Sequence, residues 1–491
     1  MNILILNGSP KGGNSITLHT CLYLEKKYPE HTFRYLNVGQ KIKQLEKDFS
    51  PALEALQEAE MIVFCYPVYT FLVPSQLHRF IELMKTSGLD FSGKAATQVS
   101  TSKHFYDITA HRFIEDNCAD LALPYLDGLS ADMDDILSEK GRRQATDWLD
   151  FTLWKLSRRE FRRPLVQTPD QVGGDVPVIP GSSTPVIPGN SAPVIPGSST
   201  PVIPGPDDHV IPGPDDHVIP GNDRESQSAV SKKDGKRAVI VTDLVPEDIT
   251  LKAMIDRFVA VFPYACDVIN IQDFPFMGGC LSCFSCAATG KCVYKDGFDE
   301  FLRGTIHKHD AILYAFRIKD HSMGSRFKMY DDRQFCNGHR TVTMGTPFGY
   351  LVEGHYSKEE NLRLLLEARA QVGGNFLAGV ATDEFDVNKD IDTLAATVAY
   401  AMEKQYTPPQ NFLGVGGMKI FRDLIYMMRG LMRADHKFFK AHGQYDFPQK
   451  KWKTSLMMYL VGWMMNNPSI KRKAGAKMSE GMIGPYKKIL E

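Results

Sequence analysis

Four cysteines in one short segment give this sequence its clearest chemical signal. The segment reads C-L-S-C-F-S-C-A-A-T-G-K-C, and its thiols are Cys280, Cys283, Cys286 and Cys292. Three thiols at two-residue gaps, with a fourth six residues on, can surround one side of a compact inorganic cluster, and a [4Fe–4S] centre needs four such thiolates. A single zinc ion more often takes two separated Cys-x-x-C pairs. The spacing favours an iron–sulfur site, with zinc or a loop without metal as the alternatives.

A second signal is a glycine-rich turn near the amino terminus. Residues 8–15 read G-S-P-K-G-G-N-S, directly after the apolar run 2–7 and before a segment with helical periodicity. Small residues let the backbone turn tightly and point its N–H groups at an anion, and the following helix adds its dipole. The turn matches neither the Walker pattern nor Gly-x-Gly-x-x-Gly, which argues against an ATP loop and a dinucleotide fingerprint. We expect a phosphate cradle here, and a plain turn is the alternative.

Strand and helix signals alternate up to residue 160 and define the element that must position this turn. The expected strands are 2–7, 32–38, 61–66, 94–100 and 121–126, and the expected helices are 15–27, 74–84, 107–118 and 134–156. Such alternation predicts a parallel sheet covered on both faces. Five strands at this length fit the doubly wound order 2-1-3-4-5 of flavodoxin-like folds.

In that strand order the loops after the first and third strands meet at one crevice. The third strand ends in Y-P-V-Y-T-F, residues 66–71, which is aromatic and apolar. A phosphate cradle beside such a loop makes a site for a phosphorylated flat ring. Ser100 and Thr101, in the loop after the fourth strand, would close the crevice with hydrogen-bond donors. Ordinary loop packing is the alternative role for Tyr69.

The middle of the chain has the composition of a linker. Val-Ile-Pro-Gly begins at residues 178, 186, 194, 202, 210 and 218, a strict eight-residue period. Proline fixes φ and removes a donor, and the glycine after each proline weakens any regular element. One Val-Ile pair per eight residues cannot build a core. We interpret 165–233 as a disordered spacer that tethers two folded units, 1–160 and 234–405.

The alternation of strands and helices recurs after the linker. Strands are expected at 237–243, 266–271, 309–316, 340–344 and 375–381, with helices at 249–262, 358–372 and 388–403. Residues 234–405 therefore form a second, diverged copy of the same five-stranded unit, and the cysteine segment follows its second strand.

Residues 406–491 fit neither copy. The segment 412–491 carries 15 Lys/Arg against 5 Asp/Glu, a charge of +10 on a chain whose net charge is −1. Half of the 20 methionines lie beyond residue 415. We expect a basic, Met-rich helical extension that packs on the second copy, and peripheral contact with an anionic membrane is the alternative.

Composition sets the compartment we expect. No signal peptide and no apolar stretch of about 18–20 residues is visible. The nine cysteines are an odd number with four clustered, which suits a metal site in a reducing cytoplasm better than a disulfide framework. No nucleic-acid partner is expected.

Two motifs together resemble a known family. G-S-P-K-G-G-N-S with Y-P-V-Y-x-x-x-x-P-x-Q-L resembles the NAD(P)H-dependent FMN reductases of the flavodoxin-like superfamily, and the cysteine segment resembles that of their relatives, the iron–sulfur flavoproteins. The resemblance implies FMN as cofactor, NAD(P)H as co-substrate and a [4Fe–4S] cluster on the four cysteines. It implies that the FMN phosphate is held by Ser9, Lys11, Gly13, Asn14 and Ser15, and that the ring contacts Pro67, Val68, Tyr69 and Thr70.

The two copies depart from the family in opposite ways. The second copy has T-D-L-V-P-E-D in place of the phosphate loop, and carboxylates there would repel a phosphate. The first copy has a charged segment, 37–49, where the cysteines should be. We therefore expect an internal pseudo-dimer, or a homo-oligomer, in which the cysteine loop of the second copy lies near the flavin of the first.

The leading functional expectation is an oxidoreductase that passes electrons from NAD(P)H to a quinone, a flavin or another small acceptor. The alternatives are an electron carrier that accepts electrons from a protein such as ferredoxin, and a metal-bound interaction scaffold. His104 and Tyr106 lie near the expected crevice and could orient a substrate, although structural roles are commoner for such residues.

Overall fold

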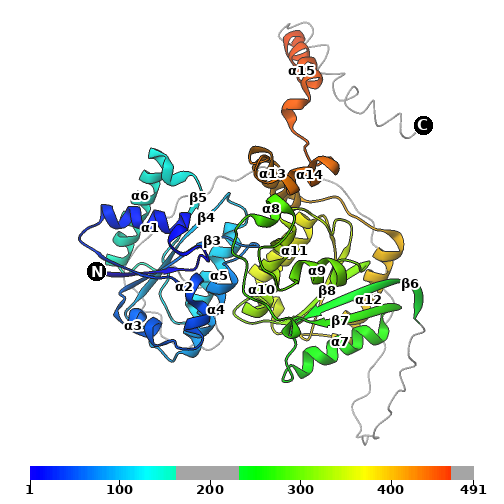
Figure 1. Ribbon diagram of the computed structural model, residues 1–491, viewed down its shortest axis with the longest axis horizontal. Coiled ribbons are helices and arrows are strands. Elements are labelled where there is room, and N and C mark those ends of the chain that lie inside the picture. The colour runs from blue at the N-terminus through cyan, green and yellow to red at the C-terminus, as the bar shows by residue number, and fades with distance from the viewer. Residues whose placement is uncertain (162–231, 466–491) are drawn as a thin grey trace, which may run out of the picture. The chain divides into compact units, whose positions relative to one another are not determined.

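The computed structural model describes residues 1–161 and 232–465. The amino-terminal sheet is entirely parallel and has the order β2-β1-β3-β4-β5. Its strands are β1 (Asn2–Asn7), β2 (Thr32–Leu36), β3 (Met61–Pro67), β4 (Ala95–Ser102) and β5 (Leu129–Asp132). Its helices are α1 (Ile16–Lys27), α2 (Val38–Leu45), α3 (Ser50–Glu58), α4 (Ser75–Thr86), α5 (Asp107–Asp120) and α6 (Glu139–Ser157) (Figure 1).

The second sheet repeats this topology. Its order is β10-β9-β8-β6-β7, which is 2-1-3-4-5 when the strands are counted from β6. The strands are β6 (Lys233–Thr242), β7 (Tyr264–Asn270), β8 (Ala311–Arg317), β9 (Pro347–Glu353) and β10 (Phe376–Thr382). The helices are α7 (Ile249–Val261), α8 (Ser285–Thr289), α9 (Phe298–Phe301), α10 (Gly324–Arg333), α11 (Glu360–Gly373) and α12 (Val387–Lys404). The expected pair of doubly wound α/β units is confirmed.

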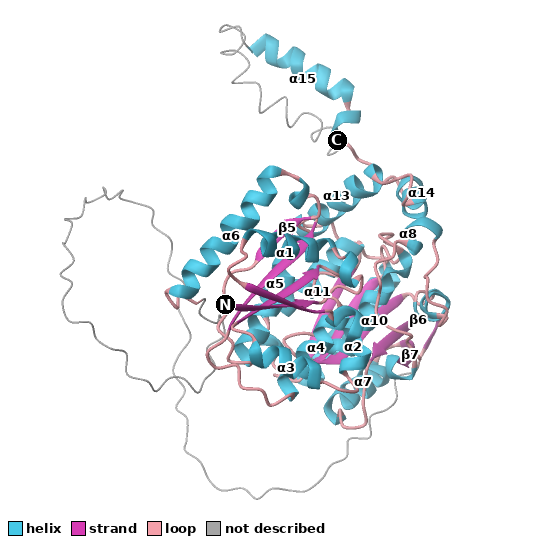
Figure 2. Ribbon diagram, turned by 60° about the vertical axis from the view of Figure 1, so that its left-hand side comes forward, coloured by secondary structure: helices cyan, strands magenta, loops and turns pink. Residues whose placement is uncertain are grey.

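Each sheet is buried on both faces because its central strands are almost wholly apolar. One face of the first sheet packs on α1 and α6, and the other on α3, α4 and α5. The second sheet packs on α7 and α12 with one face and on α10 and α11 with the other. The faces that carry α4 and α10 share one apolar core, so the two halves are joined by buried surface. The two helices lie side by side (Figure 2).

Two expected strands are wrong in position. Residues 121–126 form a turn and a single bridge at Tyr125, because Pro124 has no N–H to give to a ladder, and β5 starts later at Leu129. Residues 340–344 are also turns, and the apolar run from Pro347 supplies β9 instead. At the second place the observed strand is the more buried run, whereas β5 (L-S-A-D) is less apolar and less buried than 121–126.

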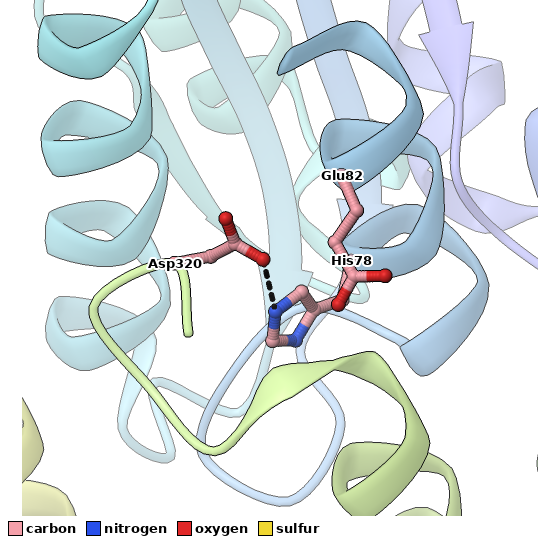
Figure 3. Close-up of side chains that lie close together, drawn as sticks. All are labelled: His78, Glu82 and Asp320. Atoms are coloured by element: carbon pink, nitrogen blue, oxygen red, sulfur yellow. Dashed lines mark ion pairs between the residues drawn. The ribbon is translucent and has the colours of Figure 1, made fainter. Parts of the chain in front are cut away.

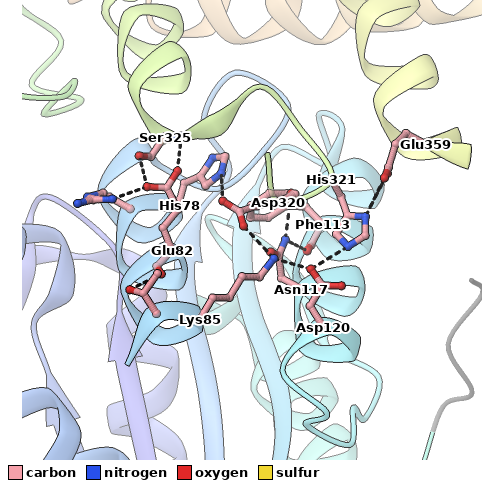
Figure 4. Close-up of polar contacts among 12 residues, drawn as sticks. His78, Glu82, Lys85, Phe113, Asn117, Asp120, Asp320, His321, Ser325 and Glu359 are labelled. Carbon is pink, nitrogen blue, oxygen red and sulfur yellow. Dashed lines mark hydrogen bonds and ion pairs between the residues drawn. The ribbon is translucent and has the colours of Figure 1, made fainter. Parts of the chain in front are cut away.

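A chain of charged side chains crosses between the halves beside this core. His78, on α4, lies 3.5 Å from Asp320 of the second half, and Asp320 pairs with Lys85 at 2.8 Å (Figure 3). His321 then joins Asp120 of α5, at 3.1 Å, to Glu359, at 3.1 Å (Figure 4). These contacts pair charges of opposite sign at the edge of the shared core.

The same region holds a cluster of potential metal ligands that the sequence did not suggest. The ligand atoms of His78, Glu82 and Asp320 all lie within 4.8 Å of one another. Glu82 already accepts hydrogen bonds from the Ser325 N–H, at 2.8 Å, and hydroxyl, at 2.7 Å, and from Arg79 at 2.7 Å. Asp320 is paired with Lys85, so the carboxylates of both Glu82 and Asp320 have protein partners. We therefore interpret the cluster as a set of contacts that stabilises the interface between the two halves.

The carboxyl-terminal extension begins with α13 (Phe412–Met427) and α14 (Arg433–Ala441), and α15 (Trp452–Met465) follows. A small apolar cluster joins α13 and α14 to the cysteine loop through Phe284 and Ala287, as expected for an extension that packs on the second copy. Within the ranges described, no helix combines the length and apolar character needed to cross a membrane. The expected linker, 165–233, lies almost wholly outside the described residues.

Candidate functional site

The glycine-rich turn is shaped by its own backbone. Gly12 has a φ of +53°, and a Cβ there would lie 2.1 Å from the Gln40 side chain, so the position requires glycine. The Asn7 amide donates to the Gly12 carbonyl at 3.0 Å and thereby fixes the turn. Ser15 caps α1 by accepting from the Leu18 N–H at 3.4 Å. The turn therefore ends on a capped helix N-terminus, as a phosphate cradle requires.

The loop after β3 makes a tight turn beside this cradle. Thr70 and Phe71 have φ of +39° and +69°, and Tyr69 and Leu72 exchange two backbone hydrogen bonds, at 2.8 and 2.9 Å. The Val68 N–H donates to the Thr101 carbonyl at 3.1 Å. These bonds hold the aromatic loop in one conformation at the carboxyl ends of the strands.

Two buried residues of the second half form hydrogen bonds with this loop. Lys328, on α10, is fully buried and donates to the Tyr69 carbonyl at 3.0 Å and to the Thr70 hydroxyl at 2.7 Å. Asp332, one turn on, pairs with Lys328 and accepts from the Thr70 hydroxyl at 2.5 Å and the Ser75 N–H at 2.8 Å. Burial lowers the pKa of the Lys328 ammonium, while Asp332 acts in the opposite direction. The position of the loop therefore depends on the second half.

Ser100 and Thr101 lie within the end of β4, and not in the loop after the fourth strand as expected, and their side chains point in different directions. Thr101 bonds Thr17 through their hydroxyls at 2.6 Å, whereas the Ser100 hydroxyl turns to His111 at 2.8 Å. The Ser102 hydroxyl is buried and has no hydrogen-bond partner among the described residues. Ser102 also lines the cavity described next, so this cavity offers an unused polar group to a ligand.

One cavity of about 370 Å³ brings the predicted site together. Its wall from the first half includes eight of the predicted FMN-binding residues, Ser9, Lys11, Ser15, Pro67, Val68, Tyr69, Thr70 and Thr101. Three other predicted residues, Gly13, Asn14 and Ser100, are not part of the wall; the first two are exposed and the third is buried against His111. All four clustered cysteines line the same cavity from the other side.

The cysteine loop is held open by donors and by left-handed residues. Ser282 and Phe284 have φ of +50° and +60°, and the Ser282 N–H points to the Cys280 sulfur at 3.4 Å. The buried Arg333 guanidinium lies 3.9 Å from the Cys292 sulfur while it pairs with Asp296 at 2.8 Å. Such N–H groups favour thiolate sulfur, the form that ligates metal.

The spacing of the four sulfurs tests which metal site they fit. Among the described residues, no three of these sulfurs lie within 4.8 Å of one another. Four thiolates on one zinc ion would lie about 3.8 Å apart, since each Zn–S bond is about 2.3 Å in a tetrahedron. Burial raises the pKa of the Cys286 thiol to about 11 and also raises that of Cys280, which favours the neutral thiol in both residues.

Lys11 connects the phosphate turn with the cysteine loop. Its ammonium lies 5.4 Å from the centre of the Phe284 ring, a cation–π contact across the cavity. Burial lowers the pKa of Lys11, and the neighbouring thiols Cys283 and Cys280 act in the opposite direction. One lysine is thus shared by both predicted ligand sites.

The extension closes the cavity with apolar side chains. Phe421 of α13 stacks on Phe105 with ring centres 4.5 Å apart, and Leu424 and Met428 line the same wall. The sequence showed the helical stripe of α13 but not that it faces this cavity. His104 and Tyr106, which were expected near the crevice, are not part of this wall: His104 pairs with Asp107, and Tyr106 donates to the Leu413 carbonyl at 2.8 Å.

Two further residues of the cavity wall were missed by sequence reasoning. The His339 Nδ1–H donates to the carboxylate of the buried Asp435 of α14 at 3.0 Å, and no described residue bonds its Nε2. Gly338, before it, has a φ of +63° and leaves room for Asp435 that a Cβ would fill. Cys336 is a fifth thiol on the wall. Neither residue lies in a recognisable motif, so no sequence signal could have identified it.

Comparison with known proteins agrees with this geometry. Residues 1–128 match the family model described as flavodoxin-like fold. An iron-sulfur flavoprotein of Archaeoglobus fulgidus is 26% identical over 175 residues, which cover 33% of this chain and 78% of that protein. Residues 1–128 are therefore similar in sequence to the flavodoxin-like family model, and the observed strand order is that of a flavodoxin-like fold.

Two solved structures are also similar to part of this chain. An NADH:FMN oxidoreductase in its apo form is 17% identical with a TM-score of 0.27, over 32% of this chain and 89% of that chain. An FMN-dependent NADH-azoreductase from Bacillus anthracis, in complex with FMN, is 14% identical with a TM-score of 0.24, over 33% of this chain and all of that chain (100%).

Proposed function

We propose that this protein is an FMN-dependent NAD(P)H oxidoreductase whose second half holds a [4Fe–4S] cluster next to the flavin. The observation that carries the proposal is that the phosphate turn, the loop after β3 and all four clustered cysteines line one cavity. The similarity to an iron-sulfur flavoprotein supports the same pairing of groups. When bound, FMN takes up hydride from a nicotinamide and releases electrons singly or in pairs, and the cluster passes single electrons.

The residues of the chain have separate tasks in this proposal. Ser9, Ser15 and the N-terminus of α1 bind the phosphate, and Lys11 adds a positive charge. The loop after β3 contacts the ring, and Lys328 and Asp332 keep that loop in place. Phe105 and Phe421 exclude water from the ring side of the cavity.

The apolar cap indicates the class of acceptor. Phe421, Leu424 and Met428 surround a flat ring better than a charged molecule, so a quinone-like acceptor fits this wall. A quinone that takes up two electrons also takes up two protons. His339, held by Asp435, would supply one of these protons from Nε2 when its ring is protonated.

A second candidate is an electron carrier that receives electrons from a protein donor. It is favoured by the exposed Cys283, which brings the cysteine loop to the surface, where Met277 and Val293 are also exposed. Such a surface lets a protein donor such as ferredoxin approach the cluster.

One experiment separates these functions. The full chain is purified without oxygen, its absorption spectrum is recorded, and FMN, iron and sulfide are quantified. We expect one FMN and about four irons per chain, and rapid NAD(P)H oxidation with a quinone. Reduction by ferredoxin alone would favour the carrier, and a colourless protein with neither FMN nor sulfide would contradict both functions.

A further inference from the structure

Helix α15 exposes large apolar side chains around its whole circumference. Trp452, Tyr459 and Trp463 are 62%, 78% and 73% exposed, and more than half of the Leu456 and Leu460 surfaces is exposed as well. Among its described side chains, Met457, Met458, Val461 and Met464 are also exposed. No described residue covers this helix, although α13 and α14 of the same extension are packed.

A helix that is apolar on all sides needs an apolar environment on more than one side. A helix on the surface of a globular protein carries a polar face, and one without a polar face belongs in a core or in lipid. Residues 452–465 span about 21 Å as a helix, which is shorter than the roughly 30 Å of a bilayer core. The helix is therefore suited to lie within the interfacial layer.

The charges around α15 indicate the kind of surface it fits. Residues 447–479 contain seven Lys/Arg and no Asp/Glu. Lys451 and Lys453 lie at the amino end of the helix and are exposed. Tryptophans occur near both ends, where amphipathic rings sit at the level of lipid headgroups. Basic flanks around an apolar helix complement an anionic lipid surface, whereas a protein core would leave these charges without partners.

We propose that α15 is an interfacial anchor that inserts into the surface of an anionic lipid bilayer. Apolar side chains enter the acyl boundary, and the flanking lysines pair with acidic headgroups. The insertion requires no flavin or cluster, so it stands apart from the proposed oxidoreductase function. Where that function holds, the anchor would bring the α13-capped cavity to acceptors dissolved in the membrane, and this consequence rests on the proposed function.

Vesicle flotation of the full chain tests the anchor. The vesicles are phosphatidylcholine alone, or phosphatidylcholine with about one-quarter phosphatidylglycerol. We expect at least about fivefold more bound protein with the anionic vesicles, and a decrease at about 0.5 M salt. Tryptophan emission should shift to shorter wavelength on binding. The proposal would be overturned if the protein bound neither kind of vesicle, or if it bound both kinds equally.

Matched variants distinguish insertion of α15 from nonspecific binding of the protein to vesicles. Leu456→Glu with Leu460→Glu should lower binding about tenfold, because charge enters the apolar face. Lys451→Gln with Lys453→Gln should lower binding to anionic vesicles by a smaller factor. Phe385→Glu is the control, since Phe385 is a 77% exposed apolar residue outside the extension. If the control loses as much binding as the helix variants, insertion of α15 is refuted.

Self-association through α15 is the competing outcome. Light scattering after size exclusion measures the mass of the wild type and of the Leu456→Glu, Leu460→Glu variant without vesicles. A dimer that the variant abolishes, together with no flotation of the wild type, would show that a second copy covers the helix and would overturn the lipid proposal. A monomer that floats with anionic vesicles supports it.

Discussion

The two halves keep the same backbone at one loop and use it for different chemistry. After β3, Thr70 and Phe71 are left-handed, and after β8, Asp320 and His321 are left-handed as well. In each loop the flanking residues exchange two backbone hydrogen bonds. Yet the first loop lines the cavity with the cysteines, and the second forms the charged chain to His78 and Lys85. Topology was retained and side chains diverged.

The cavities beside these loops differ in the same way. A cavity of about 820 Å³ lies where the second half would form its own site; it is bounded by Asp243 and Lys319 of that half and by Lys43 and Glu46 of α2 and its end. Asp243 directly follows β6, at the position that Gly8 holds after β1, and burial raises the pKa of its carboxyl to about 6. The α2 segment occupies the topological position of the cysteine loop. One half thus supplies the phosphate turn and the other supplies the thiols.

The largest effect is expected at the cysteines. Cys280→Ser should reduce iron and sulfide from about four per chain to less than about one, because one of four cluster ligands is lost. Bound FMN should remain, since the cradle is untouched. Iron, sulfide and FMN are quantified after anaerobic purification. Cys266→Ser, at a cysteine outside the cavity, is the control, and equal iron in both variants would contradict the assignment.

A carboxylate like those of the T-D-L-V-P-E-D segment can be introduced into the glycine-rich turn to test whether this turn binds phosphate. Ser15→Asp keeps a helix cap and adds a carboxylate, so FMN affinity should fall about 100-fold. Ser15→Asn caps equally well without charge and should change affinity by a few-fold. Flavin fluorescence quenching measures both. A similar loss in the two variants would mean that charge is not the reason, and Asp243→Asn should leave FMN binding unchanged.

The role of His339 as proton donor can be tested by comparing two electron acceptors, a quinone and ferricyanide. His339→Gln should lower kcat with a quinone about 10- to 100-fold and flatten its pH profile, because the proton source is removed. Oxidation of NAD(P)H with ferricyanide, which takes up no proton, should be little changed. Asp435→Asn should give a smaller loss, since it only orients the ring. Equal loss with both acceptors would point to a structural role.

Because Lys328 and Asp332 hold the loop after β3, we expect one substitution to lower both the free energy of unfolding and the affinity for FMN. Lys328→Met leaves Asp332 buried without its cation and should lower the free energy of unfolding by about 3–5 kcal/mol. FMN affinity should fall about tenfold as Tyr69 and Thr70 lose their anchor. The double variant Lys328→Met, Asp332→Leu should regain part of the stability but not the affinity. Urea unfolding and flavin titration distinguish the two.

The smallest effect concerns the charged chain. His321 has its pKa raised to about 10, against desolvation by burial, by Asp120 and Glu359. The imidazolium therefore stabilises the fold fully below about pH 6.5, and this contribution is lost as the pH rises through about 10. His321→Gln should be less stable by on the order of 2 kcal/mol at pH 6. The difference from wild type should vanish near pH 10; a constant difference would show that charge is not involved.

Much of the fold could be predicted from periodicity, but some boundaries could not. The buried apolar runs gave β1, β3 and β8 close to their observed bounds because a strand covered on both faces is apolar throughout. At 121–126 and 340–344 the strand forms a few residues later, at L-S-A-D and at P-F-G-Y-L-V-E, and local pattern does not show which segment pairs with the neighbouring strand. Motifs identified the phosphate turn and the thiols, whereas His339 and Lys328 belong to no motif.

The amino acids alone determined two α/β units, one with a phosphate turn and one with four closely spaced thiols, because these features depend on neighbours in the chain. Tertiary structure alone decided that both features face one cavity, that α10 holds the loop after β3 and that α13 closes the cavity wall. Those contacts join residues more than two hundred positions apart. They follow from the shared core between the two sheets, and no local pattern encodes them.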